Sequence, residues 1–223
     1  SLEKFKNLKL IFSMGAGVDH ILNDDTIPKN IPISRIVDPQ MAFSMTNYIL
    51  MAVLNYQRCW YDFQDAQKKN HWAQFEFNEK DLKIGVYGIG HLGMDAANAL
   101  YRLGFEVFGY SNSLKETIFP SFYGEQLLDF LNKINVLVCT VPLTPKTRGL
   151  LCTKFFKKLP NPTYLINVSR GAVHVENDII KAIKEGKLTG AFLDVFEKEP
   201  LPEESPLWQN PKIKITPHVA SLT

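Results

Sequence analysis

The chain has 223 residues, 45% of them hydrophobic, and its 25 basic and 23 acidic residues give a formal net charge of +2. A chain of this length can bury one good core or two modest ones. The near-neutral charge gives no reason to expect a nucleic acid or an anionic membrane as partner, and no apolar run is long enough to cross a bilayer.

The cysteines and histidines indicate no disulfide framework and no metal site. Cys59, Cys139 and Cys152 are odd in number and form no C-x-x-C pair, which is typical of a reduced cytosolic protein with buried or idle thiols. The 5 histidines lie in unrelated contexts, without H-E-x-x-H. The sequence therefore predicts a cytoplasmic protein that binds no metal.

The first third of the chain predicts two short strands and a long helix. Strands are expected over 8–13 and 33–37, with a glycine turn at 14–17 and a helix from Val18 between them. One long helical stretch is expected over 38–69, and apolar residues wrap most of its surface early on. A crossover or dimer helix buried between two bodies has this pattern, and so does a core helix of a single domain.

The segment 82–111, which follows an aromatic-rich linker at 71–80, reads as strand, glycine turn, helix and strand. Gly88, Gly90 and Gly93 form G-x-G-x-x-G, which makes a tight turn, lets backbone approach a pyrophosphate and lets helix pack on strand. The helix N-terminus offers free N–H groups and a positive dipole end to phosphates. This context favours a dinucleotide site over an ordinary glycine-rich turn.

The alternation of strands and helices continues to the end of the chain. The periodicity predicts further strands over 105–110, 134–140, 164–168, 188–193 and 213–216, and helices near 125–131, 153–158 and 176–185. With the strand before Gly88 this makes six strands with helical crossovers. The predicted fold class is therefore α/β, a doubly wound parallel sheet of the Rossmann type.

Three polar segments follow strands of this sheet. Arg170 comes just past one strand, Asp194 ends another and is followed five positions later by Glu199, and His218 ends the last strand. Because the strands are parallel, all three segments lie at the same edge of the sheet, where ligands bind in open α/β folds. We therefore expect these side chains to share one site.

These residue types suit the chemistry of a small acid. The planar fork of an arginine matches a carboxylate. A glutamate beside a histidine orients the imidazole and favours its protonated form, as acid–base work at neutral pH requires. Taken singly, each residue has an ordinary explanation. Arg170 could be a surface arginine, Glu199 a solvated loop charge and His218 a capped turn residue. Jointly, with the glycine motif, they favour an active site.

The motifs GIGHLG, VPLTPKTRGLL, NVSRGAVHVENDII, LDVFEKEPLPEESPLW and TPHVA together resemble the D-2-hydroxyacid dehydrogenase family, and most of all its glyoxylate/hydroxypyruvate reductase branch. SMGAGVDHIL resembles the substrate loop of that family. The resemblance implies a dinucleotide-binding domain over 76–223, preceded over 1–75 by part of a flavodoxin-like substrate domain with the long crossover helix. It also implies an opening segment before residue 1, a final helix after Thr223 and a homodimer.

The activity implied by the resemblance is the NAD(P)H-dependent reduction of a small 2-keto acid, glyoxylate or hydroxypyruvate. His218 would be the general acid that protonates the keto oxygen, and Glu199 would pair with it. Arg170 would bind the substrate carboxylate and polarise the carbonyl. Backbone N–H groups around Ala16 and Gly17 would hold the other carboxylate oxygen.

The cofactor site expected from the glycine motif and the resemblance is larger. Asp194 would lie near the nicotinamide carboxamide, and the segment after the fourth strand would line the adenosine side. The expected residues are Gly88, Gly90, His91, Leu92, Gly93, Ser111, Asn112, Ser113, Lys115, Val141, Pro142, Thr147, Val168, Ser169 and Asp194.

One departure bears on the choice of cofactor. NAD-binding members carry an acid about 20 residues beyond the glycines, which holds the ribose 2′-hydroxyl, but Ser111 stands there in the run YSNSLK. No carboxylate repels a 2′-phosphate, and Ser111, Asn112, Ser113 and Lys115 can hydrogen-bond one. The NADP-preferring branch usually has arginines where Asn112 and Leu114 stand. We expect NADP to be preferred, with NAD possible and with weaker discrimination than an arginine clamp gives.

Two other functions fit part of the sequence. A dinucleotide-sensing binding protein, like the corepressors built on this fold, would keep the cofactor site and use it to gate partner binding. A methyltransferase that uses the glycine loop for S-adenosylmethionine would leave Arg170, Glu199 and His218 unexplained. Reduction of glyoxylate, followed by loss of nicotinamide absorbance, separates the three.

Overall fold

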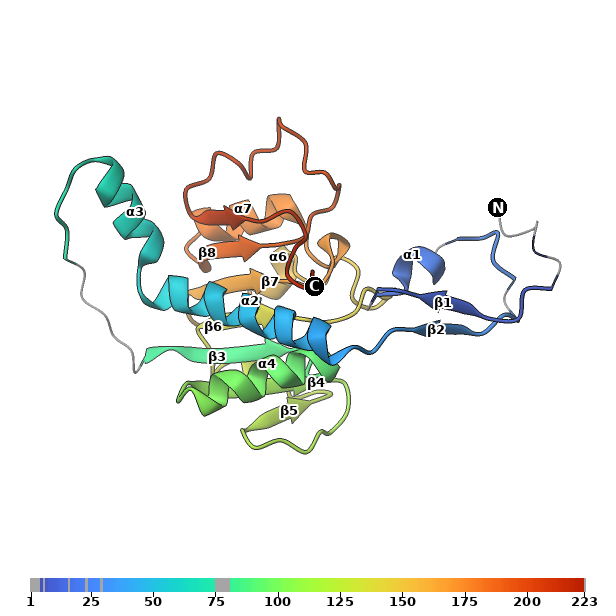
Figure 1. Ribbon diagram of the computed structural model, residues 1–223. Helices are drawn as coiled ribbons and strands as arrows, with labels where there is room; N and C mark the ends of the chain where they lie inside the picture. Colours follow the sequence, from blue (N-terminus) through green and yellow to red (C-terminus); the bar gives the residue numbers. More distant parts are fainter. Residues whose placement is uncertain are drawn as a thin grey trace.

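The main body of the molecule is a parallel sheet. The structure is a computed structural model that describes residues 5, 7–15, 17–22, 24–28, 30–74 and 81–222. The strands of the sheet are β3 (Lys83–Tyr87), β4 (Glu106–Ser111), β5 (Ser121–Tyr123), β6 (Val136–Cys139), β7 (Thr163–Asn167), β8 (Leu188–Leu193) and β9 (Ile213–Ile215). Every neighbouring pair is parallel, and the 7 strands lie in the order β5-β4-β3-β6-β7-β8-β9 (Figure 1).

This order confirms the predicted α/β, doubly wound parallel sheet. The chain runs outward from β3 to β5 and then crosses back to β6 on the other side of β3. The carboxyl ends of β3 and β6 therefore flank the switch point where such folds bind dinucleotides. The expectation of six strands is wrong by one, because β5 was missed. It has only 3 residues, pairs with β4 alone and is too short for a readable alternation.

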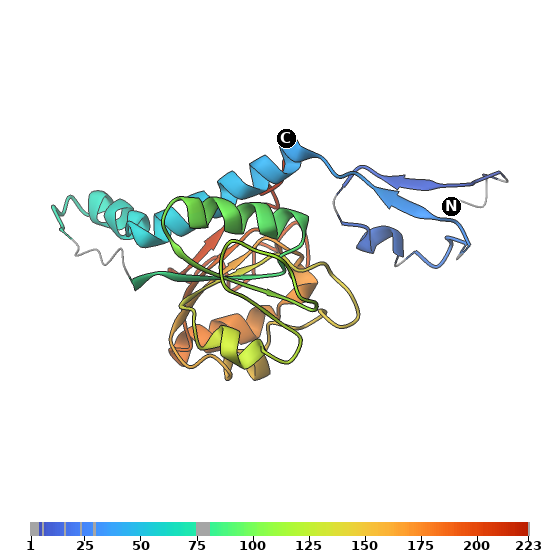
Figure 2. The same cartoon turned by 90° about the horizontal axis from the view of Figure 1, so that it is seen from below.

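Helices cover both faces of the sheet (Figure 2). On one face lie α2 (Pro39–Gln57) and α4 (His91–Arg102), and on the other α5 (Leu127–Leu131), α6 (Thr153–Phe156) and α7 (Glu176–Lys184). In α4, Ala96, Ala97 and Leu100 recur at helical spacing and are fully buried against the sheet. Each face thus has its own apolar core, and strand residues alternate between the two.

The single long helix expected over 38–69 is wrong. The structure has two helices there, α2 and α3 (Trp60–Lys68), because Cys59 adopts a left-handed backbone with φ 51° that ends the first. The start of α2 follows familiar rules: the Asp38 side chain accepts from the Gln40 N–H at 2.9 Å, and Pro39 takes the first helical position. None of the helices in the described part of the chain is long and apolar enough to cross a membrane.

The front of the chain forms a small separate unit of structure (Figure 1). The expected strands are present in shorter form as β1 (Ile11–Ser13) and β2 (Ile33–Arg35), which pair in parallel, with α1 (Asp19–Leu22) between them. Residues 71–74 of the expected linker have no regular structure, and residues 75–80 lie outside the described residues. After β7 the chain makes a 3₁₀ turn at Gly171–Val173, which the periodicity of the sequence does not predict.

Candidate functional site

The glycine loop after β3 has the three expected features: a tight turn, open space for a ligand and a close approach of the helix to the strand. Gly88 has φ +110°, which favours glycine. A Cβ at Gly93 would lie 2.3 Å from the Gly88 carbonyl oxygen, so α4 can approach the strand only without one. A Cβ at Gly90 would meet nothing within 4 Å, so open space lies beside it. Helix α4 begins here without a side-chain cap, and its first N–H groups remain available to an anion.

That open space belongs to a cavity of about 600 Å³ at the carboxyl ends of β3, β4 and β6. Its size suits a nucleotide. Of the expected cofactor residues, the structure brings nine together in its lining: Gly88, Gly90, Ser111, Asn112, Ser113, Lys115, Val141, Pro142 and Thr147. Sequence reasoning missed Tyr87, Ile89, Thr140, Thr144, Pro145, Lys146 and Leu150. The run PLTPKT already contained three of these, and Lys146 adds a second cation to Lys115.

The remaining expected cofactor residues are outside this lining. His91 is exposed at the start of α4, and the half-buried Leu92 packs on the core beside the buried Gly93. Val168 and Ser169 are both buried, and the Ser169 hydroxyl is bonded to Asn167 at 2.6 Å. A cofactor contact of these residues therefore remains a prediction.

The side chains of His218 and Glu199 are hydrogen-bonded to each other at the same edge of the sheet. His218 Nδ1 lies 2.7 Å from Glu199 Oε2, and the other carboxylate oxygen accepts from the Phe196 N–H at 2.9 Å. Because an ionised carboxylate only accepts hydrogen bonds, Nδ1 carries a proton. This leaves Nε2 as the ring nitrogen available to a ligand. The side chains are 40% and 35% exposed, so the pair is open to solvent.

Arg170 is in contact with the turn from the front of the chain. Its Nε donates to Asp19 Oδ1 at 3.0 Å, and its Nη1 donates to the Ser169 carbonyl at 2.7 Å. A Cβ placed on Gly17 would lie 1.7 Å from Nη2, so the guanidinium rests directly on this glycine. The structure thus brings Gly17 and Arg170 together. Ala16, the other expected substrate residue, lies outside the described residues.

Asp194 holds the loop that carries His218. The residue is fully buried. Its Oδ1 accepts from the Thr216 hydroxyl at 2.6 Å and the Val219 N–H at 2.9 Å, while Oδ2 accepts from the Ala220 N–H at 2.8 Å. Its carbonyl accepts from the His218 N–H at 2.8 Å. The family resemblance places Asp194 on the nicotinamide side, which remains a prediction; the bonds from Asp194 to the loop of His218 were not predicted.

A buried polar side chain four positions after Arg170 was also missed. His174 is 1% exposed, and its Nδ1 accepts from the Asn167 amide at 2.7 Å. Nε2 has no partner in the described part of the chain. Burial lowers the pKa of His174 to about 4, because a charged ring there would lose its hydration. The turn after Arg170 therefore ends at a buried, neutral histidine, which is bonded to Asn167 at the end of β7.

The lowered pKa of His174 predicts how the stability of the protein depends on pH. The pKa is lower in the folded protein than in the unfolded chain, where it is about 6.5, so the unfolded state binds more protons between pH 6.5 and 4. The stability that the folded state keeps by burying a neutral His174 is fully present above pH 6.5, and it is lost as the pH falls toward 4. We expect the free energy of unfolding in urea to fall by about 2 kcal/mol from about pH 7 to about pH 5. In His174→Gln the slope over this range should be markedly shallower; an equal slope would contradict the assignment.

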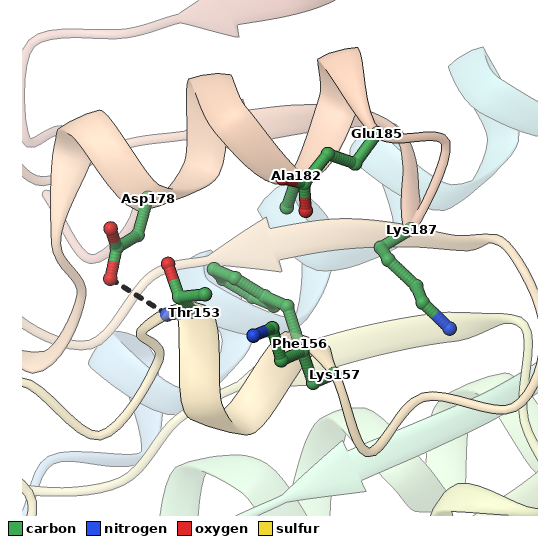
Figure 3. A pocket seen from close by; sticks show the side chains of 7 residues that line it. All are labelled: Thr153, Phe156, Lys157, Asp178, Ala182, Glu185 and Lys187. Atoms are coloured by element: carbon green, nitrogen blue, oxygen red, sulfur yellow. Dashed lines mark hydrogen bonds between the residues drawn. The ribbon is translucent and has the colours of Figure 1, made fainter.

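A second, much smaller cavity is not a candidate ligand site. It lies between α6 and α7, and Figure 3 shows its lining. Its volume of about 10 Å³ has room for little more than one water. Asp178 accepts there from the Thr153 N–H at 2.7 Å and so caps α6 (Figure 3).

Comparison with known families identifies the chain's relatives. A family model described as "D-isomer specific 2-hydroxyacid dehydrogenase, NAD binding domain" matches residues 50–220. The chain belongs to this family. The resemblance inferred from the motifs is thus confirmed. Glyoxylate/hydroxypyruvate reductase A of Photorhabdus laumondii subsp. laumondii is 42% identical over 224 residues, which cover 97% of this chain and 72% of that protein.

Solved structures of 2-hydroxyacid dehydrogenases have the same fold. One from Xanthobacter autotrophicus Py2, in complex with NADPH and MES, has a TM-score of 0.94 and 39% identity, covering 100% of this chain and 71% of that one. The NADPH-dependent glyoxylate/hydroxypyruvate reductase of Sinorhizobium meliloti, in complex with NADP and sulfate, has a TM-score of 0.92 and 38% identity, covering 96% and 69%. Both hold the cofactor that the Ser111 position favours.

Proposed function

We propose that this chain is part of an NADPH-dependent reductase that converts glyoxylate or hydroxypyruvate into the 2-hydroxy acid. The observation that carries the proposal is the His218–Glu199 pair, 2.7 Å apart, at the sheet edge that also bears Arg170 and the glycine loop. A binding protein that only senses the dinucleotide does not need an acid–base pair there. The names and bound cofactors of the relatives support the same conclusion.

In this proposal each residue acts at a stated atom. Arg170 binds the substrate carboxylate through its Nη edge, since Asp19 occupies Nε. The backbone around Gly17 and Ala16 holds the second carboxylate oxygen. His218 Nε2 donates a proton to the keto oxygen while the adjacent carbon accepts a hydride. Glu199 keeps the proton on Nδ1 throughout, so that Nε2 is the proton donor.

The cavity fits the cofactor. Gly90 leaves space where a pyrophosphate would approach the uncapped start of α4, and Ser111, Asn112, Ser113 and Lys115 would hold the ribose end. When bound, NADPH supplies the hydride.

The test is the reduction of glyoxylate and of hydroxypyruvate by the full-length protein, followed by loss of nicotinamide absorbance. Turnover with NADPH supports the proposal. Tight NADPH binding without turnover on any 2-keto acid supports the dinucleotide-sensing alternative instead.

The choice of cofactor gives a second prediction. Ser111 is the last residue of β4, and its hydroxyl donates to the Ser113 carbonyl at 2.5 Å. We expect a moderate preference for NADPH, and we expect Ser111→Asp to reverse it, because the carboxylate repels a 2′-phosphate and accepts from a 2′-hydroxyl. The measurement is kcat/KM for NADPH and NADH. Ser111→Ala, which adds no charge, should leave the preference for NADPH in place. A parent that prefers NADH would refute this interpretation.

We also propose that the protein is a homodimer through α2. This helix buries one side on the sheet and leaves apolar side chains exposed on the other: Phe43 at 59%, Met51 at 41% and Leu54 at 40%. Leu54→Glu is expected to give a monomeric mass by light scattering at micromolar concentration. Leu128→Glu, at an exposed position on α5, should leave the dimer intact. A monomeric parent would contradict the proposal.

The division of the chain remains a proposal as well. We assign residues 1–75 to part of a flavodoxin-like substrate domain and residues 76–223 to the dinucleotide-binding domain. The parallel pair of β1 and β2 supports this division. Helix α2 belongs to the first part by sequence, yet it packs against α4 of the second.

A further inference from the structure

A chain of hydroxyl groups connects helix α2 to the loop that carries His218. The Tyr48 hydroxyl is hydrogen-bonded to the Thr216 hydroxyl, and the Thr216 hydroxyl donates to Asp194 Oδ1 at 2.6 Å. Asp194 accepts in turn from the Val219 and Ala220 N–H groups. The backbone on both sides of His218 is therefore tied to one buried carboxylate and, through it, to α2.

The direction of each bond in this chain follows from the number of protons. A threonine hydroxyl has one proton, and Thr216 gives it to Asp194. The Tyr48 hydroxyl must therefore donate to Thr216 Oγ1. Burial raises the pKa of the Tyr48 phenol above its ordinary value, so that it keeps its proton at neutral pH. Tyr48 is 9% exposed, and its ring packs edge-on against Phe192 of β8, with centroids 5.6 Å apart.

The backbone of His218 has an uncommon conformation. Its φ of 55° lies in the left-handed region, which is uncommon outside glycine, although histidine, asparagine and aspartate adopt it more often than other side-chain-bearing residues. His218 lies in an exposed loop just after the last strand. Without anchors on both sides, such a loop would relax toward a more ordinary backbone and take the imidazole with it.

We propose that Tyr48 and Thr216 are positioning residues for His218: their hydroxyls, through Asp194, fix the loop so that the imidazole faces the substrate bound at Arg170. This inference rests on the proposed function, because it takes His218 as the general acid. Neither residue has a predicted contact with substrate or cofactor, and Asp194, which is expected near the nicotinamide, keeps its bonds to the Val219 and Ala220 N–H groups when either hydroxyl is removed. Removing either hydroxyl should therefore lower kcat, with little change in the KM for NADPH.

The same helix provides a matched control. Tyr56 also lies on α2, and its hydroxyl is bonded to another threonine, Thr189, at 3.1 Å. Thr189 lies near the start of β8, at the opposite edge of the sheet from His218. Tyr56→Phe removes a similar tyrosine–threonine bond from the same helix without touching the loop of His218.

The experiment measures kcat and KM in the full-length protein for Thr216→Val, Thr216→Ser, Tyr48→Phe and Tyr56→Phe. We expect Thr216→Val to lower kcat about 10- to 100-fold, as small displacements of a catalytic group do. Tyr48→Phe should lower it about threefold to tenfold. Thr216→Ser retains the hydroxyl and should stay within about threefold of the parent, and Tyr56→Phe should be unchanged. The KM for NADPH should change less than about twofold in all four.

A second measurement does not depend on turnover. The imidazole NMR signals of His218, assigned by their loss in His218→Gln, should shift in Thr216→Val and Tyr48→Phe but not in Tyr56→Phe. Unshifted signals together with a parental kcat in both variants would overturn the inference, and so would equal losses of kcat in Tyr48→Phe and Tyr56→Phe. A parent without reductase activity would refute the proposed function, whereas an active parent with unaffected variants would refute this inference alone.

Discussion

Replacing His218 with glutamine is expected to lower kcat for glyoxylate about 10²- to 10⁴-fold, the usual contribution of a general acid. Glutamine can still donate a hydrogen bond to Glu199, which lies 2.7 Å from His218 Nδ1, but an amide N–H is too weakly acidic to transfer its proton to a keto oxygen. The NADPH dissociation constant should remain nearly unchanged, since the cavity beside the glycine loop does not include His218. The measurements are steady-state turnover and a binding titration with NADPH.

The control for this experiment is His71→Gln, which changes an exposed histidine in the linker after α3. It should keep the parent kcat. Near-normal turnover in His218→Gln would remove this residue from the chemistry.

The conservative change Arg170→Lys is expected to lower kcat/KM for glyoxylate about 10²-fold, although the positive charge is kept. The guanidinium serves Asp19 through Nε, the Ser169 carbonyl through Nη1 and the face of Gly17 through Nη2. A lysine ammonium is a point charge on a flexible chain and cannot hold Asp19 while presenting a fork to a carboxylate. The measurement is kcat/KM over a range of glyoxylate concentrations.

Arg102→Lys, an exposed change in the last turn of α4, serves as the matched control and should match the parent. If Arg170→Lys also kept the parent kcat/KM, Arg170 would not be the carboxylate-binding residue.

The parts of the fold that the sequence predicted are those that depend on local backbone chemistry. Gly88, Gly90 and Gly93 could be assigned because a tight turn, a close ligand and a close helix each exclude a Cβ, and the structure has this geometry. The apolar strands of the sheet could be located because a buried parallel strand is a short apolar run.

The parts that were missed depend on tertiary structure. The break at Cys59 interrupts a stretch, residues 40–69, that contains neither glycine nor proline, so no strong local signal marks it. Strand β5 exists because β4 offers it an edge to pair with. The bonds of Asp194 to the loop after β9 join residues that are far apart in the chain, and the burial of His174 depends on how its segment packs. Residue types alone therefore placed Asp194 at the site without revealing what it holds.

The attachment of α2 to the sheet determines which parts of the site can move relative to one another. Tyr48 fixes the middle of the helix to the loop after β9, and near its end the Tyr56 ring stacks on Tyr164 of β7 with centroids 3.9 Å apart. A helix held at its middle and near its end, and buried along one side from Ala42 to Val53, moves as a rigid body with the sheet. Any hinge between the front strands and the sheet must therefore lie at residues 36–38, ahead of α2. Opening there would carry Asp19 away from Arg170 and leave His218 and Glu199 in place. The acid–base pair would then persist, while the proposed carboxylate site between Arg170 and the front turn would be separated into its two parts.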